Sequence, residues 1–226
     1  MFMTKLLRIA IDGPGGAGKS TIAKAVSIEL GIDYVDTGAM YRAAGYKLHT
    51  NGIGPEDTRE IANLMDKTDI AFSGGAVYLD GENVEKYIRT EQVSKLASEY
   101  SKIGVVRQKL VDIQKRMAQK QSLVMDGRDI GTNVIPDAEY KFFITADPEE
   151  RAKRRYLQQK EKSGEADFQE ILKDIKDRDW KDTHREINPL RRAEDAVNVD
   201  TTEMNIEQVC DFILSSLQRD DNGDII

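Results

Sequence analysis

The sequence predicts an α/β fold in which a central parallel sheet is flanked by helices. The first observation is an apolar run, "LLRIAID", followed by the glycine-rich stretch "GPGGAGKST" and by a segment in which Ile22, Val26 and Leu30 recur at helical spacing. A strand, a glycine loop and a helix in this order begin a β-α-β unit. The second observation is that three later apolar runs, "SLVMDG", "YKFFITAD" and "AVNVDTT", read as further buried strands between helical segments.

Residues 69–85, "DIAFSGGAVYLDGENVE", depart from the α/β pattern. The pairs Gly74-Gly75 and Asp80-Gly81 are hairpin signals, and each lies between short runs of β-prone residues. We therefore expect three small antiparallel strands, inserted as a subdomain into the α/β chain.

Helices are predicted on both sides of this insertion, in "DTREIANLMDK" and "SKIGVVRQKLVDIQKRMA". A later helix begins at Pro148, where we expect Asp147 to act as the N-cap and Glu150 to complete a capping box. The last helix has an apolar stripe of four residues: Ile206, Val209, Ile213 and Leu217.

The composition is that of a globular protein, because 39% of the 226 residues are hydrophobic and 32% are charged. No apolar run approaches the roughly 20 residues that cross a bilayer. One cysteine, Cys210, excludes an internal disulfide, and we expect a cytoplasmic protein. The net charge of −7 argues against general nucleic-acid binding, and without an interface signal we expect a monomer.

The glycine-rich stretch fits the pattern G-x-x-x-x-G-K-[ST], with Gly13, Gly18, Lys19 and Ser20 at the fixed positions. Its bare backbone N–H groups and the following helix N-terminus can surround a triphosphate such as ATP. Lys19 can reach the β- and γ-phosphates, and the Ser20 hydroxyl can hold Mg²⁺. We expect nine residues to contact the triphosphate: Gly13, Pro14, Gly15, Gly16, Ala17, Gly18, Lys19, Ser20 and Thr21.

Arginines are concentrated on two later predicted helices, as expected for a local basic cleft that takes a small anion. The first helix places three on one face: Arg151, Arg154 and Arg155. The second helix aligns another three charged residues: Arg178, Asp182 and Arg185. A Ser-Gly pair lies between the two helices, so they suit a lid that closes over phosphates. The alternative is ordinary surface ion pairing, for example between Arg178 and Asp182.

Several motifs together resemble the bacterial cytidylate kinase family, in order from about Ile9 to Leu217: "IDGPGGAGKST", "VDTGAMYRA", "IRTEQVSKLAS", "VRQKL", "DGRDIGTNVIPDA", "EERAKRR", "IKDRDWKDTHRE" and "DTTEMNIEQV". The resemblance implies a P-loop kinase with an enlarged monophosphate-binding insertion and a helical lid. We expect the insertion at 38–106 and the lid at 151–175. The core domain would then comprise 1–37, 107–150 and 176–226.

The resemblance also implies roles for individual residues. The acceptor monophosphate would be held by Arg42, Arg128 and Arg185, the ribose by Arg178 and Asp182, and the base by Ser98, Arg107 and Asp129. Thr37 and Tyr41 would line the same pocket, while Arg151 and Arg154 would contact ATP. The residues that carry catalysis would be Lys19, Arg128, Arg155 and Arg185. The chain departs from the family at Ser20, where some members have glycine, and at Thr37, where serine is common.

The reaction implied is Mg²⁺-dependent transfer of the ATP γ-phosphate to CMP or dCMP, with small nucleotides as the only partners. Two alternatives remain open at this point. One is another small-molecule kinase, for UMP, AMP or shikimate. The other is a non-catalytic nucleotide-binding module or GTPase switch, although no Asn-Lys-x-Asp sequence occurs in the chain.

Overall fold

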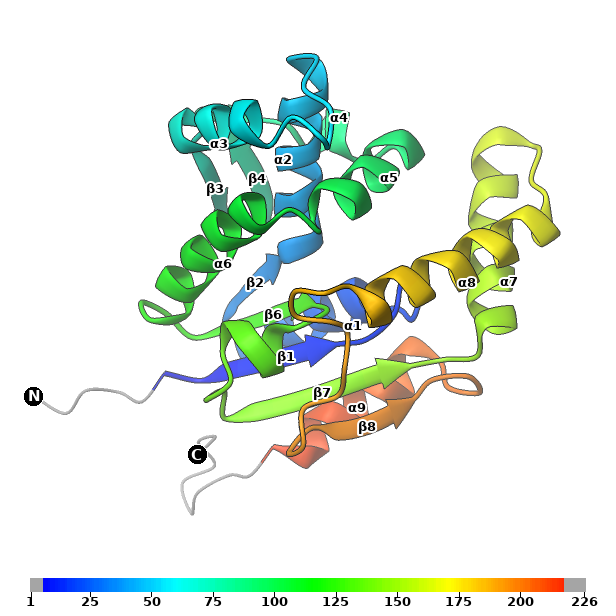
Figure 1. The fold of residues 1–226 in the computed structure, drawn as a ribbon. Helices are drawn as coiled ribbons and strands as arrows, with labels where there is room; N and C mark the ends of the chain where they lie inside the picture. The colour runs from blue at the N-terminus through cyan, green and yellow to red at the C-terminus, as the bar shows by residue number, and fades with distance from the viewer. Residues whose placement is uncertain (1–5, 218–226) are drawn as a thin grey trace, which may run out of the picture. The chain divides into compact units, whose positions relative to one another are not determined.

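The computed structural model describes residues 6–217 and divides into two compact units (Figure 1). The core unit extends up to Ile32 and resumes at Ser122, and the inserted unit is Asp33–Gln121. The inserted unit contains the hairpins that the sequence predicts.

The core unit is built on parallel strands in the order β6-β1-β7-β8. Their bounds are β1 (Arg8–Asp12), β6 (Leu123–Gly127), β7 (Tyr140–Thr145) and β8 (Val197–Asp200). Ile9 of β1 lies opposite Val124 on one side and Tyr140 on the other. Almost every residue of β1 and β6 is buried, because helix packing covers these strands, and the predicted parallel sheet is confirmed.

Helices and one π-helical turn connect these strands: α1 (Lys19–Leu30), η1 (Ile130–Val134), α7 (Pro148–Ser163), α8 (Phe168–His184) and α9 (Ile206–Ser216). α1 packs against β6 and α9, and α7 packs against α8 (Figure 1). Val209, Ile213 and Leu217 are buried as predicted, but Ile206 in the first turn of α9 is 51% exposed. No helix within residues 6–217 has the length and apolar character of a membrane span.

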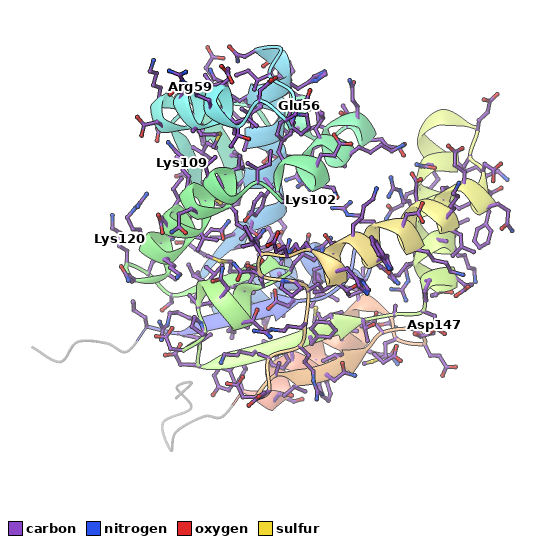
Figure 2. The ribbon with its side chains drawn as sticks, in the orientation of Figure 1. Glu56, Arg59, Lys102, Lys109, Lys120 and Asp147 are labelled. Atoms are coloured by element: carbon purple, nitrogen blue, oxygen red, sulfur yellow. The ribbon has the colours of Figure 1, made fainter. Side chains whose placement is uncertain are left out.

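The predicted capping box at α7 is wrong, although α7 does begin with Pro148 after Asp147 (Figure 2). The Asp147 side chain makes no capping hydrogen bond among the described residues, and its backbone N–H donates to Thr202 Oγ1 at 3.1 Å. The Glu150 carboxylate lies 3.5 Å from Arg154 Nε instead of reaching back. An ion pair one turn further along the helix has replaced the expected cap.

The inserted unit begins with β2 (Asp33–Asp36) and contains a three-stranded antiparallel sheet, β3 (Ile70–Ser73), β4 (Ala76–Leu79) and β5 (Glu82–Asn83). Its helices are α2 (Thr37–Thr50), α3 (Thr58–Lys67), α4 (Glu85–Ile88), α5 (Glu91–Tyr100) and α6 (Gly104–Ala118). Asp80 and Gly81 take positive φ angles of 51° and 85° in the second hairpin turn, as the type of turn requires. The small sheet predicted from the sequence is confirmed.

Close packing of α2 against α5 and of α3 against α6 organises this unit. A Cβ added to Gly45 of α2 would lie 3.2 Å from the backbone nitrogen of Ala97, so the glycine permits the contact between α2 and α5. Lys109 of α6 (Figure 2) donates from Nζ to the carbonyl oxygen of Met65, at the C-terminal end of α3. A cation there also opposes the negative end of the helix dipole.

Candidate nucleotide-binding site

The glycine loop connects β1 to α1 in a conformation that side chains would prevent. Gly13 has a φ of 146°, and a Cβ there would lie 1.9 Å from the carbonyl oxygen of Ile144. Gly18, with a φ of 87°, is the N-cap of α1, and no described side chain caps the helix. The first turn of α1 also lacks acidic residues. The N–H groups at this helix end are therefore suited to an anion.

Lys19 lies buried at the start of α1, with 5% of its surface exposed. Its Nζ donates to the carbonyl oxygen of Pro14 at 2.7 Å, so the side chain folds back over the glycine loop. Burial, reinforced by the positive charges of Arg128 and Arg178, lowers the pKa of Lys19 to about 7. A phosphate placed in the loop would supply the negative charge that favours the protonated amine.

Asp126 is a site residue that the sequence analysis missed. It lies near the end of β6, is 4% exposed, and its Oδ2 accepts a hydrogen bond from Ser20 Oγ at 2.9 Å. A hydroxyl and a carboxylate oxygen side by side are ligands that Mg²⁺ accepts. The available signal was the acidic residue that ends the apolar run "SLVM". Within residues 6–217 no group of three or more His, Cys, Asp or Glu residues could hold a metal without a substrate.

The three arginines of α7 make different contacts. Arg151 is buried, and its guanidinium donates to the carbonyl oxygens of Ala146 and Gly15 and to Asp179 Oδ2. Arg154 donates from Nη2 to the carbonyl oxygen of Thr201 at 2.6 Å. Arg155 is half-buried on the same helix. Arg151 thus holds the backbone of the glycine loop, which is a structural contribution that helical spacing alone does not indicate.

Two guanidinium–carboxylate pairs in the core unit involve the residues assigned to the acceptor. Arg128 Nε lies 2.8 Å from Asp182 Oδ2, and Arg185 Nη2 lies 3.1 Å from Asp129 Oδ1. Arg178 Nε lies 4.0 Å from the same Asp182 oxygen. Burial by itself would raise the pKa of Asp182, but Arg128, Arg178 and Arg185 outweigh it and hold that pKa below its usual range.

This cluster adjoins the glycine loop. A Cβ added to Gly15 would lie 3.5 Å from Arg128 Nη2 and 3.7 Å from Arg178 Cδ. The structure therefore brings together, within one unit, the loop assigned to the triphosphate and five residues assigned to the acceptor: Arg128, Asp129, Arg178, Asp182 and Arg185.

The other residues that the sequence analysis assigns to the acceptor lie in the inserted unit, on three helices. Thr37, Tyr41 and Arg42 belong to α2, Ser98 to α5 and Arg107 to α6. The guanidinium carbon of Arg107 lies 5.5 Å from the centre of the Tyr41 ring. This is a cation–π contact between two residues that the sequence analysis assigns to the acceptor. Arg107 is 2% exposed and donates to the carbonyl oxygen of Ser101.

Asp36 and Arg89 complete the surroundings of Arg42, and the sequence analysis did not single out either. Asp36 Oδ2 lies 2.9 Å from Arg42 Nη2 and 2.8 Å from Arg89 Nη1, while Oδ1 accepts from the Ala39 N–H at 2.8 Å. Burial opposes ionisation, but the two arginines lower the pKa of Asp36. One carboxylate therefore caps α2 and orients two guanidinium groups.

A parallel sheet that carries a glycine loop, a buried lysine and a hydroxyl–carboxylate pair defines a P-loop nucleotide-binding protein. The family model described as "Cytidylate kinase" matches residues 9–219. The chain belongs to the cytidylate kinase family.

Individual relatives agree with this assignment. A protein of Caldicellulosiruptor bescii named cytidylate kinase is 49% identical over 214 residues, covering 93% of this chain and 95% of the relative. A protein of Clostridium perfringens with the same name is 46% identical over 217 residues, covering 96% of this chain and all of the relative. The fold resembles the crystal structure of an uncharacterised protein from Eubacterium ventriosum, with a TM-score of 0.50 at 15% identity over 93% of this chain and 97% of that one.

Proposed function

We propose that this chain is an ATP-dependent kinase that transfers the γ-phosphate to CMP or dCMP, giving CDP or dCDP. The observation that carries the proposal is the cluster of Arg128, Arg178 and Arg185 with Asp129 and Asp182. Two of its members, Arg128 and Arg178, lie directly beside Gly15 of the glycine loop. Family membership over nearly the whole chain supports cytidylate as the acceptor.

In the proposed reaction an oxygen of the acceptor phosphate attacks the γ-phosphorus of ATP, and ADP leaves. A phosphomonoester has a second pKa near 6, so the attacking group is mostly dianionic at neutral pH and needs no general base. His49 and His184 are exposed and take no part.

The main barrier is repulsion between the two anionic nucleotides. Two unit charges about 4 Å apart interact by about 4 kcal/mol at an effective dielectric near 20. Lys19, Arg128, Arg155 and Arg185 would offset this repulsion, most strongly as charge develops on the transferred group.

Base selection is proposed to depend on Asp129, together with Ser98 and Arg107. A carboxylate accepts a hydrogen bond from the exocyclic amine of cytosine, whereas uracil presents a carbonyl at that position and would leave the charge unpaired. Arg42 is also assigned to the acceptor phosphate, and Thr37 and Tyr41 to the acceptor. Arg178 and Asp182 are assigned to the ribose hydroxyls.

Mg²⁺ is proposed as the metal, bound with ATP, because the Ser20 hydroxyl and the Asp126 carboxylate suit a hard cation. The ion would neutralise phosphate charge when bound. Helices α7 and α8 are proposed to form the lid over residues 151–175, which would exclude water and limit ATP hydrolysis. We further propose a cytoplasmic monomer that takes nucleotides and not nucleic acid.

The test is an acceptor panel of CMP, dCMP, UMP, AMP and shikimate, each with ATP and Mg²⁺. We expect the highest kcat/KM with CMP or dCMP, and a Lys19→Met variant should abolish conversion of either. Preference for UMP, AMP or shikimate would replace this function with that of another kinase. Binding of ATP without transfer to any acceptor would favour a nucleotide-binding module.

A further inference from the structure

Asp12 is a buried carboxylate to which the proposed reaction gives no role. It is the last residue of β1 and immediately precedes Gly13 of the glycine loop. Its relative exposure is 5%, and in the sheet it lies opposite Gly127 of β6, the residue before Arg128.

Both carboxylate oxygens of Asp12 accept backbone hydrogen bonds from the same turn. Oδ1 accepts from the N–H of Ile130 and Oδ2 accepts from the N–H of Gly131, each at 2.8 Å. These two residues begin η1 and directly follow Arg128 and Asp129. A single side chain at the start of the glycine loop therefore fixes a backbone segment more than a hundred residues further along the chain.

The anchored turn presents two of the residues assigned to the acceptor. Arg128, two residues before Ile130, extends to Asp182, and Asp129, one residue before it, extends to Arg185; Asp12 accepts the Ile130 N–H. A shift of this turn would move the proposed phosphate ligand and the proposed base reader together. The turn has little room to move, because Gly131 packs closely against the Lys141 side chain. A Cβ added to Gly131 would lie 3.2 Å from Lys141 Cδ.

A carboxylate is a costly group to bury for a purely structural purpose. Burial raises the pKa of Asp12 to about 6, while the two N–H groups favour its ionised form. What it offers that an amide does not is two acceptor oxygens in a fixed fork. An asparagine would retain one acceptor and direct its NH₂ group at the other N–H.

We infer that Asp12 is a positioning residue for acceptor recognition: by holding the N–H groups of Ile130 and Gly131, it sets Arg128 and Asp129 in place beside the glycine loop. This inference rests on the proposed function and deepens it, because it concerns the acceptor half of the same site.

The test compares the wild-type chain with Asp12→Asn and measures kcat/KM for CMP and for UMP in the same preparation. The ratio of the two constants does not depend on the fraction of active protein, so a loss of stability alone leaves it unchanged. Displacement of a reacting or recognising group by about 1 Å lowers the reaction rate by up to about 100-fold. We therefore expect the ratio of kcat/KM for CMP to kcat/KM for UMP to fall by about tenfold or more.

Two control variants separate this effect from general ones. Asp200, at the end of the parallel strand β8, also accepts a backbone N–H, but from Thr202, and Asp200→Asn should leave the ratio unchanged. Val209→Ala removes buried volume from α9 and destabilises the same unit without touching the turn. A ratio that stays within about twofold of wild type in Asp12→Asn, or that falls equally in Val209→Ala, would overturn the inference.

Asp12→Glu, which keeps the charge but moves the carboxylate by one methylene, should also lower the ratio. If neither variant folds, amide hydrogen exchange of the wild-type chain decides. The Ile130 and Gly131 N–H groups should be as protected from exchange as those of the core strands. Fast exchange at both would refute the inference that Asp12 holds this turn in place. A wild-type chain that phosphorylates no cytidine monophosphate would contradict the proposed function, whereas normal CMP activity with unchanged Asp12→Asn selectivity contradicts only this inference.

Discussion

Binding of ATP should draw a proton onto the protein, because the lysine of the glycine loop is held partly neutral in the absence of nucleotide. With burial lowering the pKa of Lys19 to about 7, half of the amines are neutral at about pH 7 and about 0.9 of them at about pH 8. The β- and γ-phosphates would favour the charged amine and return this pKa toward its ordinary value. The expected uptake is therefore about 0.5 proton per ATP at about pH 7 and about 0.9 at about pH 8.

The assay is titration calorimetry of Mg²⁺·ATP into the chain, in two buffers of different protonation enthalpy. The difference in observed heat gives the number of protons taken up. Burial raises the pKa of Asp12 to about 6, so a measurement at about pH 8 begins with this carboxylate ionised. Lys19→Arg, with a cation that does not titrate in this range, is the matched control and should show no uptake. Identical heats in both buffers for the wild-type chain would refute the argument, since Lys19 would then be charged before ATP arrives.

Further predictions concern the acceptor site and the core. Arg128→Met and Arg185→Met should each lower kcat with CMP by about 100-fold or more, because each removes a cation from the transferred phosphate. ATP affinity by calorimetry should change little, and wild-type turnover in both would defeat the assignment. Asp129→Ala should narrow the preference for CMP over UMP in competition assays, and an unchanged ratio would remove Asp129 from base selection. Leu110→Ala, at a fully buried site, should lower the free energy of unfolding in urea by about 2–5 kcal/mol. Ile28→Ala, at a side chain that is 70% exposed, is its control and should cost less than about 0.5 kcal/mol.

The periodic parts of the fold are predictable from sequence, and the parts decided by packing are not. The strands at "LLRIAID" and "YKFFITAD" are recognised by their apolar residues, and the hairpin turns are recognised by their glycines. Helix α2 is not predicted from the sequence, because Gly38 and Gly45 weaken its helical pattern. Gly45 is explained only by the backbone of α5 packed against it, a contact that no local pattern contains.

The residues of the candidate site likewise fall into those that a sequence pattern predicts and those that only packing brings together. Gly13, Lys19 and Ser20 belong to a contiguous motif, so spacing alone finds them. Asp12 and Asp36 are the last residues of β1 and β2, and Asp126 is next to last in β6; at such positions the sequence alone is equally consistent with a helix cap or a solvated carboxylate. Asp12 and Asp126 have hydrogen-bond partners far away in the sequence. Asp12 accepts from Ile130, 118 residues away, and Asp126 accepts from Ser20, 106 residues away. Only the folded structure identifies these pairs.

In the proposed mechanism, fixed cations allow ATP and cytidylate to react directly with each other. It is tested most directly by incubating the purified chain with CMP, Mg²⁺ and ATP that carries a labelled γ-phosphate. We expect the label in the β-phosphate of CDP, with an equal amount of ADP. Label recovered only as inorganic phosphate, or left in ATP, would contradict it.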